Sequence, residues 1–506
     1  METTRITSLL QQAVGLQQQG RFAQAEELYR QVLQLQPDNF DALHLSGVLA
    51  RQTGRPQAAL DLIRQAIQIN PHQAAAYCNA GAALQDLQRP QEALASYDQA
   101  LQIRPDYALA LNNRGNALRN LLRYDEALAS YQQAIAVKPD YAEAYNNHGS
   151  VLHRQHRYEA ALLSYRRALQ LNPVLADAWN NQGIALHALH AYEDAVASYE
   201  QALLIKPDYA EAYCNRGMAL QKLRRFQQAL DSYEQTLRLQ PQYANAHVHR
   251  ADSLRALGRN SEAIAAYRKA LEHGANAGQI NYALAALGAA PAPAASPAAY
   301  VKELFDQYAG HFEQHLLQGL QYRTPALLVD AVRQTAREAT VPATPAAWNI
   351  VDLGCGTGLC GPLLKPLAGR LVGVDISPNM LEQAAQKGLY DELVYGEIAG
   401  FLRQQRDCYD LVLAADVFVY IGDLAEVFAG ARQGLKSGGI FGFSVEESDG
   451  DDIVLRASRR FAHSPSYLRK MAQEYGFILE KMDRCAIRQD EGQDVYGYLL
   501  VMRCVK

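Results

Sequence analysis

Residues 108–141 read ALALNNRGNALRNLLRYDEALASYQQAIAVKPDY, and the same pattern returns every 34 residues along the first half of the chain. Alanines, glycines and tyrosines keep this period, and prolines mark it most clearly. These prolines are Pro37, Pro71, Pro105, Pro139, Pro173, Pro207 and Pro241. A register kept over eight units indicates an array of repeated supersecondary units rather than one globular core.

Each unit predicts a pair of short helices. Alanine, leucine and glutamine dominate the pattern and favour helix. Gly115 allows close helix approach, Tyr131 fills the space between units, and Pro139 ends the second helix. Because each pair leaves an apolar face that only the next pair covers, the units stack into a solenoid. The pattern resembles the tetratricopeptide repeat over residues 6–277, and residues 278–288 predict a capping helix.

One polar position also repeats every 34 residues, on the first helix of five units. It is occupied by Asn79, Asn113, Asn147, Asn181 and Asn215. A carboxamide both donates and accepts hydrogen bonds, so such a row can bind the backbone of an extended peptide. The row is similar to the asparagine ladder in the repeats of O-linked N-acetylglucosamine transferase. The alternative is that these asparagines serve packing between repeats.

Composition limits the classes of function. The chain has 506 residues and a formal net charge of −5, which gives no electrostatic case for nucleic acid as a partner. Its seven cysteines are scattered and form no CxxC, which favours free thiols in a reducing compartment and argues against a zinc site or any other metal site. We find no signal peptide and no segment suited to spanning a membrane. The sequence predicts a cytoplasmic protein that contacts no membrane.

The pattern changes after the repeats. Residues 287–300 are rich in proline and alanine and predict a semi-rigid linker. From about residue 349, short apolar runs alternate with helical stretches, which is typical of a doubly wound α/β sheet. Two late runs, FILEKMDR and YGYLLVMRC, predict an antiparallel pair that finishes the sheet. We therefore predict a solenoid with its cap over 1–286, the linker over 287–300 and an α/β domain over 301–506.

The first predicted strand ends in VDLGCGTG at residues 351–358. A glycine-rich turn there lets the backbone approach a bound nucleotide. A dinucleotide fold needs G-x-G-x-x-G, but Leu359 occupies the sixth position. The run instead resembles motif I of the class I S-adenosylmethionine-dependent methyltransferases. The resemblance implies S-adenosylmethionine as cofactor, held by Asp352 and the three motif glycines. These glycines are Gly354, Gly356 and Gly358.

Other cofactor contacts come from later strand ends. Asp375 ends the second strand, where a carboxylate can accept hydrogen bonds from ribose hydroxyls, and the neighbouring Ile376 joins the predicted site. The resemblance places Glu397 near the adenine, although the family often has Asp there. Asp416 ends the fourth strand and, with Tyr420, borders cofactor and substrate.

The segment before the first strand adds two cofactor contacts. FDQYA at 305–309 resembles the N-terminal helix of small-molecule methyltransferases of the biotin- and quinone-pathway type. Tyr308 can lie over the sulfonium by a cation–π contact, and Arg323 can pair with the cofactor carboxylate. For both residues the alternative is a structural or solvated side chain.

Methyl transfer needs a general base only when the acceptor arrives protonated. We predict His463 for that role, with Tyr467 nearby, against the alternative of a capping or surface histidine. Five acids between Glu446 and Asp452 predict a cationic acceptor, against the alternative of a solvated acidic loop.

Three functions remain open. In the first, the repeats recruit a protein or peptide that is methylated. In the second, the acceptor is a small molecule and the repeats dock an unrelated partner. The third is a catalytically inactive scaffold, against which the intact glycine motif and Asp375 argue.

Overall fold

The structure is a computed structural model that describes residues 2–310, 312–314, 322–338, 348–450, 452–490 and 493–506. Asp451, one of the five acids of the predicted acidic loop, lies outside these residues. The chain forms two compact units, Met1–Leu257 and Gly258–Lys506. The predicted capping helix and linker are therefore part of the same unit as the predicted sheet.

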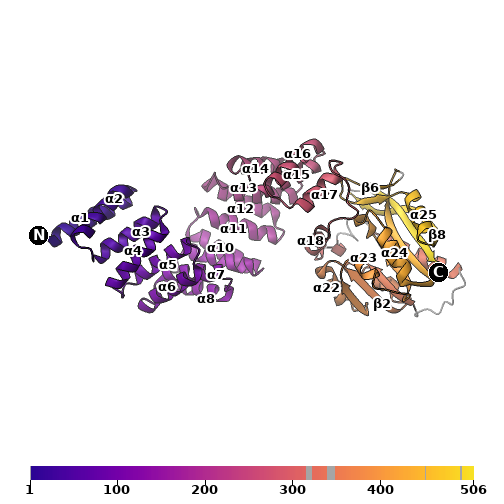
Figure 1. Ribbon diagram of the computed structural model, residues 1–506, viewed down its shortest axis with the longest axis horizontal. Helices are drawn as coiled ribbons and strands as arrows, with labels where there is room; N and C mark the ends of the chain where they lie inside the picture. Colours follow the sequence, from indigo (N-terminus) through magenta and orange to yellow (C-terminus); the bar gives the residue numbers. More distant parts are fainter. Residues whose placement is uncertain (1, 311, 315–321, 339–347, 451, 491–492) are drawn as a thin grey trace. The chain divides into compact units, whose positions relative to one another are not determined.

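The first unit consists of antiparallel helix pairs stacked in chain order (Figure 1). Its helices are α1 (Glu2–Gln18), α2 (Phe22–Leu35), α3 (Phe40–Gln52), α4 (Pro56–Ile69), α5 (Ala74–Asp86), α6 (Pro90–Ile103), α7 (Ala108–Asn120), α8 (Tyr124–Val137), α9 (Ala142–Arg154), α10 (Tyr158–Leu171), α11 (Ala176–Ala188), α12 (Tyr192–Ile205), α13 (Ala210–Lys222), α14 (Phe226–Leu239) and α15 (Ala244–Ala256). With α16 (Asn260–Glu272), which opens the second unit, they supply the eight predicted helix pairs.

In five of the helix pairs, a tyrosine from the second helix packs against a glycine of the first. Tyr131 is fully buried, and a Cβ built on Gly115 would lie 2.5 Å from its ring. The Tyr131 hydroxyl donates to the side chain of Asn116 at 2.7 Å. The repeated glycine thus marks a place where the two helices of a pair lie so close that there is no room for a Cβ.

In the described residues, the second unit is built on a nine-stranded sheet. Seven strands follow one another in the order β3-β2-β1-β4-β5-β7-β6, and β9 and β8 branch off at β5. Strands β3, β2, β1, β4 and β5 are parallel, β9 runs antiparallel to β5, and β8 runs antiparallel to β9. The strands are β1 (Trp348–Leu353), β2 (Ala368–Asp375), β3 (Glu392–Tyr395), β4 (Tyr409–Ala414), β5 (Leu435–Glu447), β6 (Ile453–Leu455), β7 (Phe461–His463), β8 (Phe477–Asp490) and β9 (Gln493–Cys504). The predicted doubly wound sheet and its antiparallel final pair are confirmed.

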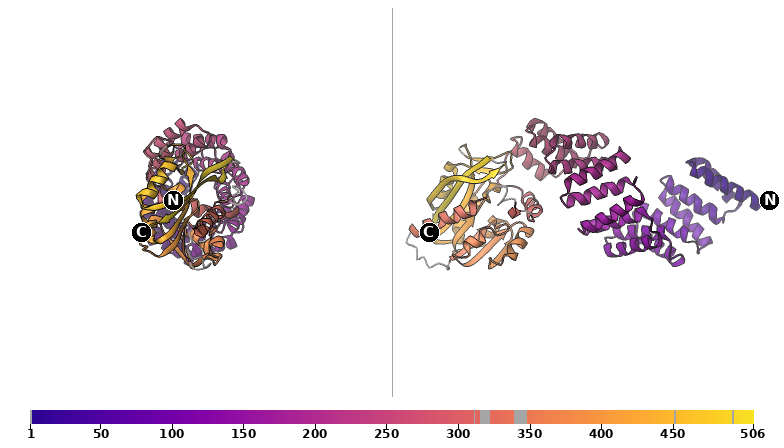
Figure 2. Two further views of the ribbon diagram at one scale, coloured as in Figure 1. Left: turned by 90° about the vertical axis from the view of Figure 1, so that its right-hand side faces the viewer. Right: turned by 180° about the vertical axis from the view of Figure 1, so that it is seen from behind.

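Helices cover both faces of this sheet (Figure 2). The further helices of the second unit are α17 (Ala277–Ala286), α18 (Ala298–Tyr308), α19 (Phe312–Gln314), α20 (Thr324–Glu338), α21 (Gly361–Leu364), α22 (Pro378–Gln386), α23 (Ile398–Leu402), α24 (Ala425–Gly434) and α25 (Pro465–Glu474), with a 3-10 turn, η2 (Phe418–Tyr420). Successive side chains of β1 point to opposite faces of the sheet and belong to two hydrophobic cores. Val351 packs with α24 and α25, and Ile350 packs with α20 and α21.

The segment predicted as a linker pairs with the loop that follows η2. The carbonyl of Ala294 accepts hydrogen bonds from the backbone N–H groups of Gly422 and Asp423, both at 2.8 Å. Ser296 donates its N–H to the carbonyl of Tyr420, also at 2.8 Å. These bonds fix an extended segment, as proline-rich sequence favours, but they fix it against the α/β sheet unit rather than leaving it as a spacer.

Candidate active site

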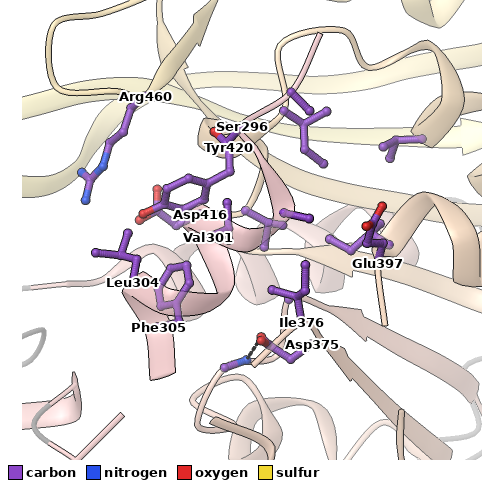
Figure 3. A pocket seen from close by; sticks show the side chains of 18 of the residues that line it. Ser296, Val301, Leu304, Phe305, Asp375, Ile376, Glu397, Asp416, Tyr420 and Arg460 are labelled. Carbon is purple, nitrogen blue, oxygen red and sulfur yellow. Dashed lines mark hydrogen bonds between the residues drawn. The ribbon is translucent and has the colours of Figure 1, made fainter. Parts of the chain in front are cut away.

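A cavity of about 700 Å³ lies at the carboxyl edge of the parallel strands (Figure 3). The turn after β1, the end of β2 and the segment after β4 all contribute to its wall. Ligands of doubly wound sheets bind at this edge, where the connections that follow the strands meet. The cavity is therefore the candidate active site.

The glycine turn forms the floor of one end of the cavity. Gly354 and Gly356 line it and have φ values of +65° and +55°, in the left-handed region that favours glycine. A Cβ on Gly354 would lie 2.6 Å from Val417, so the turn has no room for a side chain there. Gly358, at φ +85°, does not line the cavity but packs on the ring of Tyr390.

Asp375 lines the same end and is held in place by backbone donors. Its Oδ2 accepts from the N–H of Gly356 at 2.9 Å, and its Oδ1 accepts from the N–H of Ser377 at 2.8 Å. Burial raises the pKa of this carboxyl above its ordinary value, although these hydrogen bonds oppose the shift. A carboxylate has about four lone-pair sites in all, so Asp375 can accept a further bond from a ligand.

Asp352 lies beneath the turn instead of in the cavity wall. The residue is 1% exposed, and its Oδ2 accepts a hydrogen bond from the Tyr390 hydroxyl at 2.7 Å. Burial raises the pKa of the Asp352 carboxyl to about 7, against the lowering effect of that hydrogen bond. The structure therefore does not bring this predicted cofactor ligand to the cavity, because the Tyr390 side chain takes its carboxylate.

The opposite end of the cavity contains Asp416 and Tyr420 (Figure 3). Asp416 has a φ of +60°, which is uncommon outside glycine. Its backbone N–H donates to Ser444 Oγ at 2.7 Å, and its Oδ1 accepts from Arg488 at 3.0 Å. These two bonds hold a carboxylate in an unusual backbone conformation at the cavity wall.

The remaining predicted cofactor residues separate into two groups. Ile376, Glu397 and Tyr308 line the cavity, and the Tyr308 ring packs edge-on against Phe312 with centroids 5.9 Å apart. Arg323 is exposed and is not among the described residues that line the cavity. Its neighbour Tyr322 lines the cavity instead. Helix α20 begins at Thr324, directly after the arginine, and Arg323 is exposed.

The predicted catalytic pair supports a loop and does not face the cavity. His463 is fully buried, and its Nε2 lies 2.9 Å from the carbonyl of Gly422. The Tyr467 hydroxyl accepts from the N–H of Leu424 at 2.9 Å. Burial lowers the pKa of His463 to about 4, so this imidazole is neutral at pH 7. Neither residue is among the described lining residues, and the geometry gives neither of them contact with a substrate.

The first two members of the acidic run form ion pairs. Glu446 and Glu447 end β5 and are paired with arginines of neighbouring strands and loops. Glu447 accepts from Arg484 at 2.9 Å and from the Tyr498 hydroxyl at 2.7 Å. The prediction of a cationic acceptor therefore rests on Asp449 and Asp452, which are exposed, and it stays a prediction.

Sequence reasoning missed the arginines of the cavity. Arg460 and Arg488 line it together with Phe305 and the segment 294–298. Arg460 follows the β6 strand and Arg488 lies within β8, so no local motif marks either one. Only the pairing of β7 with β5, and of β9 with both β5 and β8, brings them to this place.

Four of the five asparagines in the row contact the preceding repeat, and the fifth contacts its neighbour in the same helix. Asn147, Asn181 and Asn215 donate to Asn112, Asn146 and Asn180, respectively, at 3.0, 3.0 and 3.1 Å. Asn79 lies 2.8 Å from the ring of His44, and Asn113 accepts from Asn112 at 3.4 Å. The packing role that the sequence left open is thus present in the structure.

The fold and this cavity define the class of protein. The chain joins N-terminal tetratricopeptide repeats to a C-terminal class I methyltransferase domain, as its sequence predicts. Residues 351–441 match the family model "Methyltransferase domain". Models described as "Tetratricopeptide repeat" match residues 10–74, 74–107 and 214–280, and "TPR repeat" matches residues 123–156, 149–190 and 187–223. Class I methyltransferase domains use S-adenosylmethionine.

Curated relatives match the methyltransferase part of the chain. Methyltransferase-like protein 27 of Homo sapiens is 41% identical over 90 residues, which covers 18% of this chain and 34% of the relative. The malonyl-acyl-carrier-protein O-methyltransferase of Acetivibrio thermocellus is 31% identical over 99 residues, covering 19% and 35%. The chain thus spans about a third of the length of these relatives.

Solved structures match the repeats. The crystal structure of the APC/C hetero-tetramer Cut9-Hcn1 is similar with a TM-score of 0.42 and 19% identity, over 53% of this chain and 52% of that one.

None of the described helices is both long and apolar enough to cross a membrane.

Proposed function

We propose that this protein transfers a methyl group from S-adenosylmethionine to an acceptor that enters the cavity. The observation that carries the proposal is the glycine turn of Gly354 and Gly356, joined through a hydrogen bond to Asp375 at one end of the cavity. Glycines give the cofactor close access to the backbone, and the carboxylate offers acceptors to ribose hydroxyls. The residues present therefore fit the group.

When bound, S-adenosylmethionine supplies a methyl group on a positively charged sulfur, which a nucleophile displaces in line. The chain's own residues align the reactants and exclude water. Glu397 and Ile376 line the cofactor side, Tyr308 also lines the cavity, and Phe305 packs edge-on against Tyr420. Asp416 and Tyr420, on the opposite wall, are placed to contact the acceptor.

We infer that the repeats recruit a protein partner. Tetratricopeptide repeats suggest protein–protein interaction. A carboxamide has two N–H donors and a carbonyl, so one bond to the neighbouring repeat does not exhaust Asn147 or Asn181. All lining residues come from the second unit, which supports a small acceptor or an inserted side chain and leaves the repeats as the docking element.

The cofactor assignment is tested with Asp375. Replacing it with Ala removes the ribose acceptors and the support of the Gly356 N–H, so S-adenosylmethionine should bind at least tenfold more weakly, about 1.4 kcal/mol. Calorimetry on the full chain measures this. The control is Glu392→Gln, because Glu392 on β3 forms an exposed ion pair with Arg370 on β2. This variant should bind S-adenosylmethionine with unchanged affinity. Unchanged affinity in Asp375→Ala, or tight binding of NAD by the wild type, would rule out the assignment.

A further inference from the structure

Asp416 presents one open carboxylate oxygen to the cavity. Its Oδ1 accepts a hydrogen bond from Arg488 at 3.0 Å, whereas its Oδ2 accepts none from any residue that the structure describes. The Asp416 side chain lines the cavity and is 18% exposed. An ionised carboxylate only accepts hydrogen bonds, so a ligand that satisfies Oδ2 must bring a donor.

The Asp416 carboxylate is held in position from behind. Arg488, whose side chain is 3% exposed, donates both to Asp416 and to the buried Glu446. The backbone N–H of Asp416 donates to the fully buried Ser444 hydroxyl at 2.7 Å. A left-handed backbone such as that of Asp416 persists only where its surroundings fix it. The open oxygen is therefore positioned before a ligand enters, and alignment of this kind is what methyl transfer requires.

The wall around Asp416 is aromatic. Tyr322 and Tyr420 line the cavity, and Phe305 meets Tyr420 edge-on with centroids 5.4 Å apart. Figure 3 shows Asp416 and Tyr420 on the same side of the cavity, across from Asp375. Aromatic rings favour such offset and edge-on neighbours, so this wall suits an acceptor that carries a ring.

Acceptors of different chemistry would meet the Asp416 oxygen differently. A carboxylate acceptor has no proton to donate and would be repelled. An amine next to a carboxylate is favoured in its protonated form, which has no lone pair for the attack. A hydroxyl donates its proton and keeps its lone pairs. A phenolic hydroxyl, with a pKa of about 10, gives up that proton more readily than an alcohol and also supplies a ring.

Resting on the proposed function, we propose that Asp416 is a catalytic residue, the general base that takes the proton of a phenolic acceptor. The phenolic oxygen attacks the methyl carbon, the bond from that carbon to sulfur breaks, and its electron pair stays on sulfur. The hydroxyl proton passes to Asp416 Oδ2, which later returns it to water. The products are a methyl ether and neutral S-adenosylhomocysteine. His463, predicted for the role of base, is buried and does not line the cavity.

The binding test uses the full chain saturated with S-adenosylhomocysteine, followed by calorimetry. The probes are para-alkylphenols, each compared with its methyl ether and with the carboxylic acid and the amine of the same skeleton. N-acetyltyrosinamide is a further probe, which distinguishes a tyrosine side chain from a small phenol. We expect a phenol to bind at least about tenfold more tightly than its methyl ether, because the ether has no donor for Asp416.

Asp416→Asn should abolish this preference for the phenol. Asparagine tolerates the left-handed backbone and keeps an oxygen for Arg488, but it places an N–H₂ group where Oδ2 was. The matched control is Asp330→Asn on α20, where the side chain is 65% exposed, and this variant should keep the preference.

The role as a base is tested by turnover with S-adenosylmethionine, measured as formation of S-adenosylhomocysteine. Asp416→Asn should lower kcat for a para-alkylphenol on the order of a hundredfold. The loss should be much smaller for para-nitrophenol at alkaline pH, because this acceptor arrives already ionised. Equal losses for the two acceptors would show that Asp416 does not act as the base.

Three other results would overturn the proposal. They are the absence of phenol binding or turnover in the wild type, an unchanged preference in Asp416→Asn, and an amine as the best probe. The last of these is the result that the prediction from Asp449 and Asp452 favours. Titration of the wild type with S-adenosylhomocysteine alone separates these results from failure of the proposed function, in which this ligand would not bind.

Discussion

At the residue scale, the glycine turn depends on side chains packed around it. Tyr390 lies against Gly358 and Gly373, and its hydroxyl donates to Asp352. Val417 closes the other side against Gly354. The motif's acidic residue, Asp352, thus supports the turn from beneath, whereas Asp375 lines the cavity.

The raised pKa of Asp352 makes a prediction about stability. An acid whose pKa is raised from 3.8 to about 7 on folding binds its proton more tightly in the folded state. The folded state should therefore lose stability as pH rises through that window, by on the order of a few kcal/mol. Asp352→Asn should flatten this slope. Fluorescence of Trp348 on β1, in a Trp179→Phe background, follows urea unfolding of the second unit alone.

The background chain with Asp352 intact is the control for that measurement. Equal pH slopes for the two chains would show that Asp352 ionises in the folded state as it does in the unfolded one.

At the element scale, five of the repeats are held by a contact between a tyrosine and a glycine across their two helices. The contact recurs because the helices approach closely at Gly81, Gly115, Gly149, Gly183 and Gly217, where a Cβ would lie within 3 Å of the ring. Repeat arrays are stabilised by such local and nearest-neighbour contacts, so one unit can be probed by itself.

Gly115→Ala should destabilise the solenoid by about 1–3 kcal/mol, because the buried Tyr131 ring must move. Gly15→Ala is the matched control: it lies inside α1 with nothing within 4 Å of a built Cβ, so helix propensity should raise stability by up to about 1 kcal/mol. Urea unfolding followed by circular dichroism measures both. A shift in the same direction for both variants would contradict the packing account.

At the scale of the whole molecule, the active site extends upstream of the sheet. Segment 294–298 contributes to the cavity wall, and α17 supports it through Tyr282. The Tyr282 hydroxyl bonds both to Ser296 Oγ and to the carbonyl of Arg459, each at 2.6 Å. The functional unit therefore begins before residue 301.

A truncation series tests this unit. Residues 258–506 contain every described lining residue, so this fragment should bind S-adenosylhomocysteine within about twofold of the full chain. A fragment over 301–506 lacks the Ala294 carbonyl that accepts from Gly422 and Asp423, and should bind at least tenfold more weakly. A fragment over 287–506 keeps the segment without α17 and should fall between them. Equal binding by all three fragments would exclude the segment from the site.

The sequence by itself determined the repeats, the class of sheet and the glycine turn that lines one end of the cavity. A 34-residue period and a glycine turn are local patterns, because helix packing and backbone approach act on neighbouring residues. Asp375 was predictable because it ends a strand within the same short unit.

Only the tertiary structure decided the end of the cavity that carries Asp416 and Arg488. Strand pairing between β5, β7, β8 and β9 brings Arg460 and Arg488 to Glu446 from distant parts of the chain. The same packing buries His463 and turns Asp352 toward Tyr390. The sequence does not distinguish a titratable residue that supports the fold from one that is placed to bind a ligand. Burial and hydrogen-bond partners make this distinction, and long-range contacts set both.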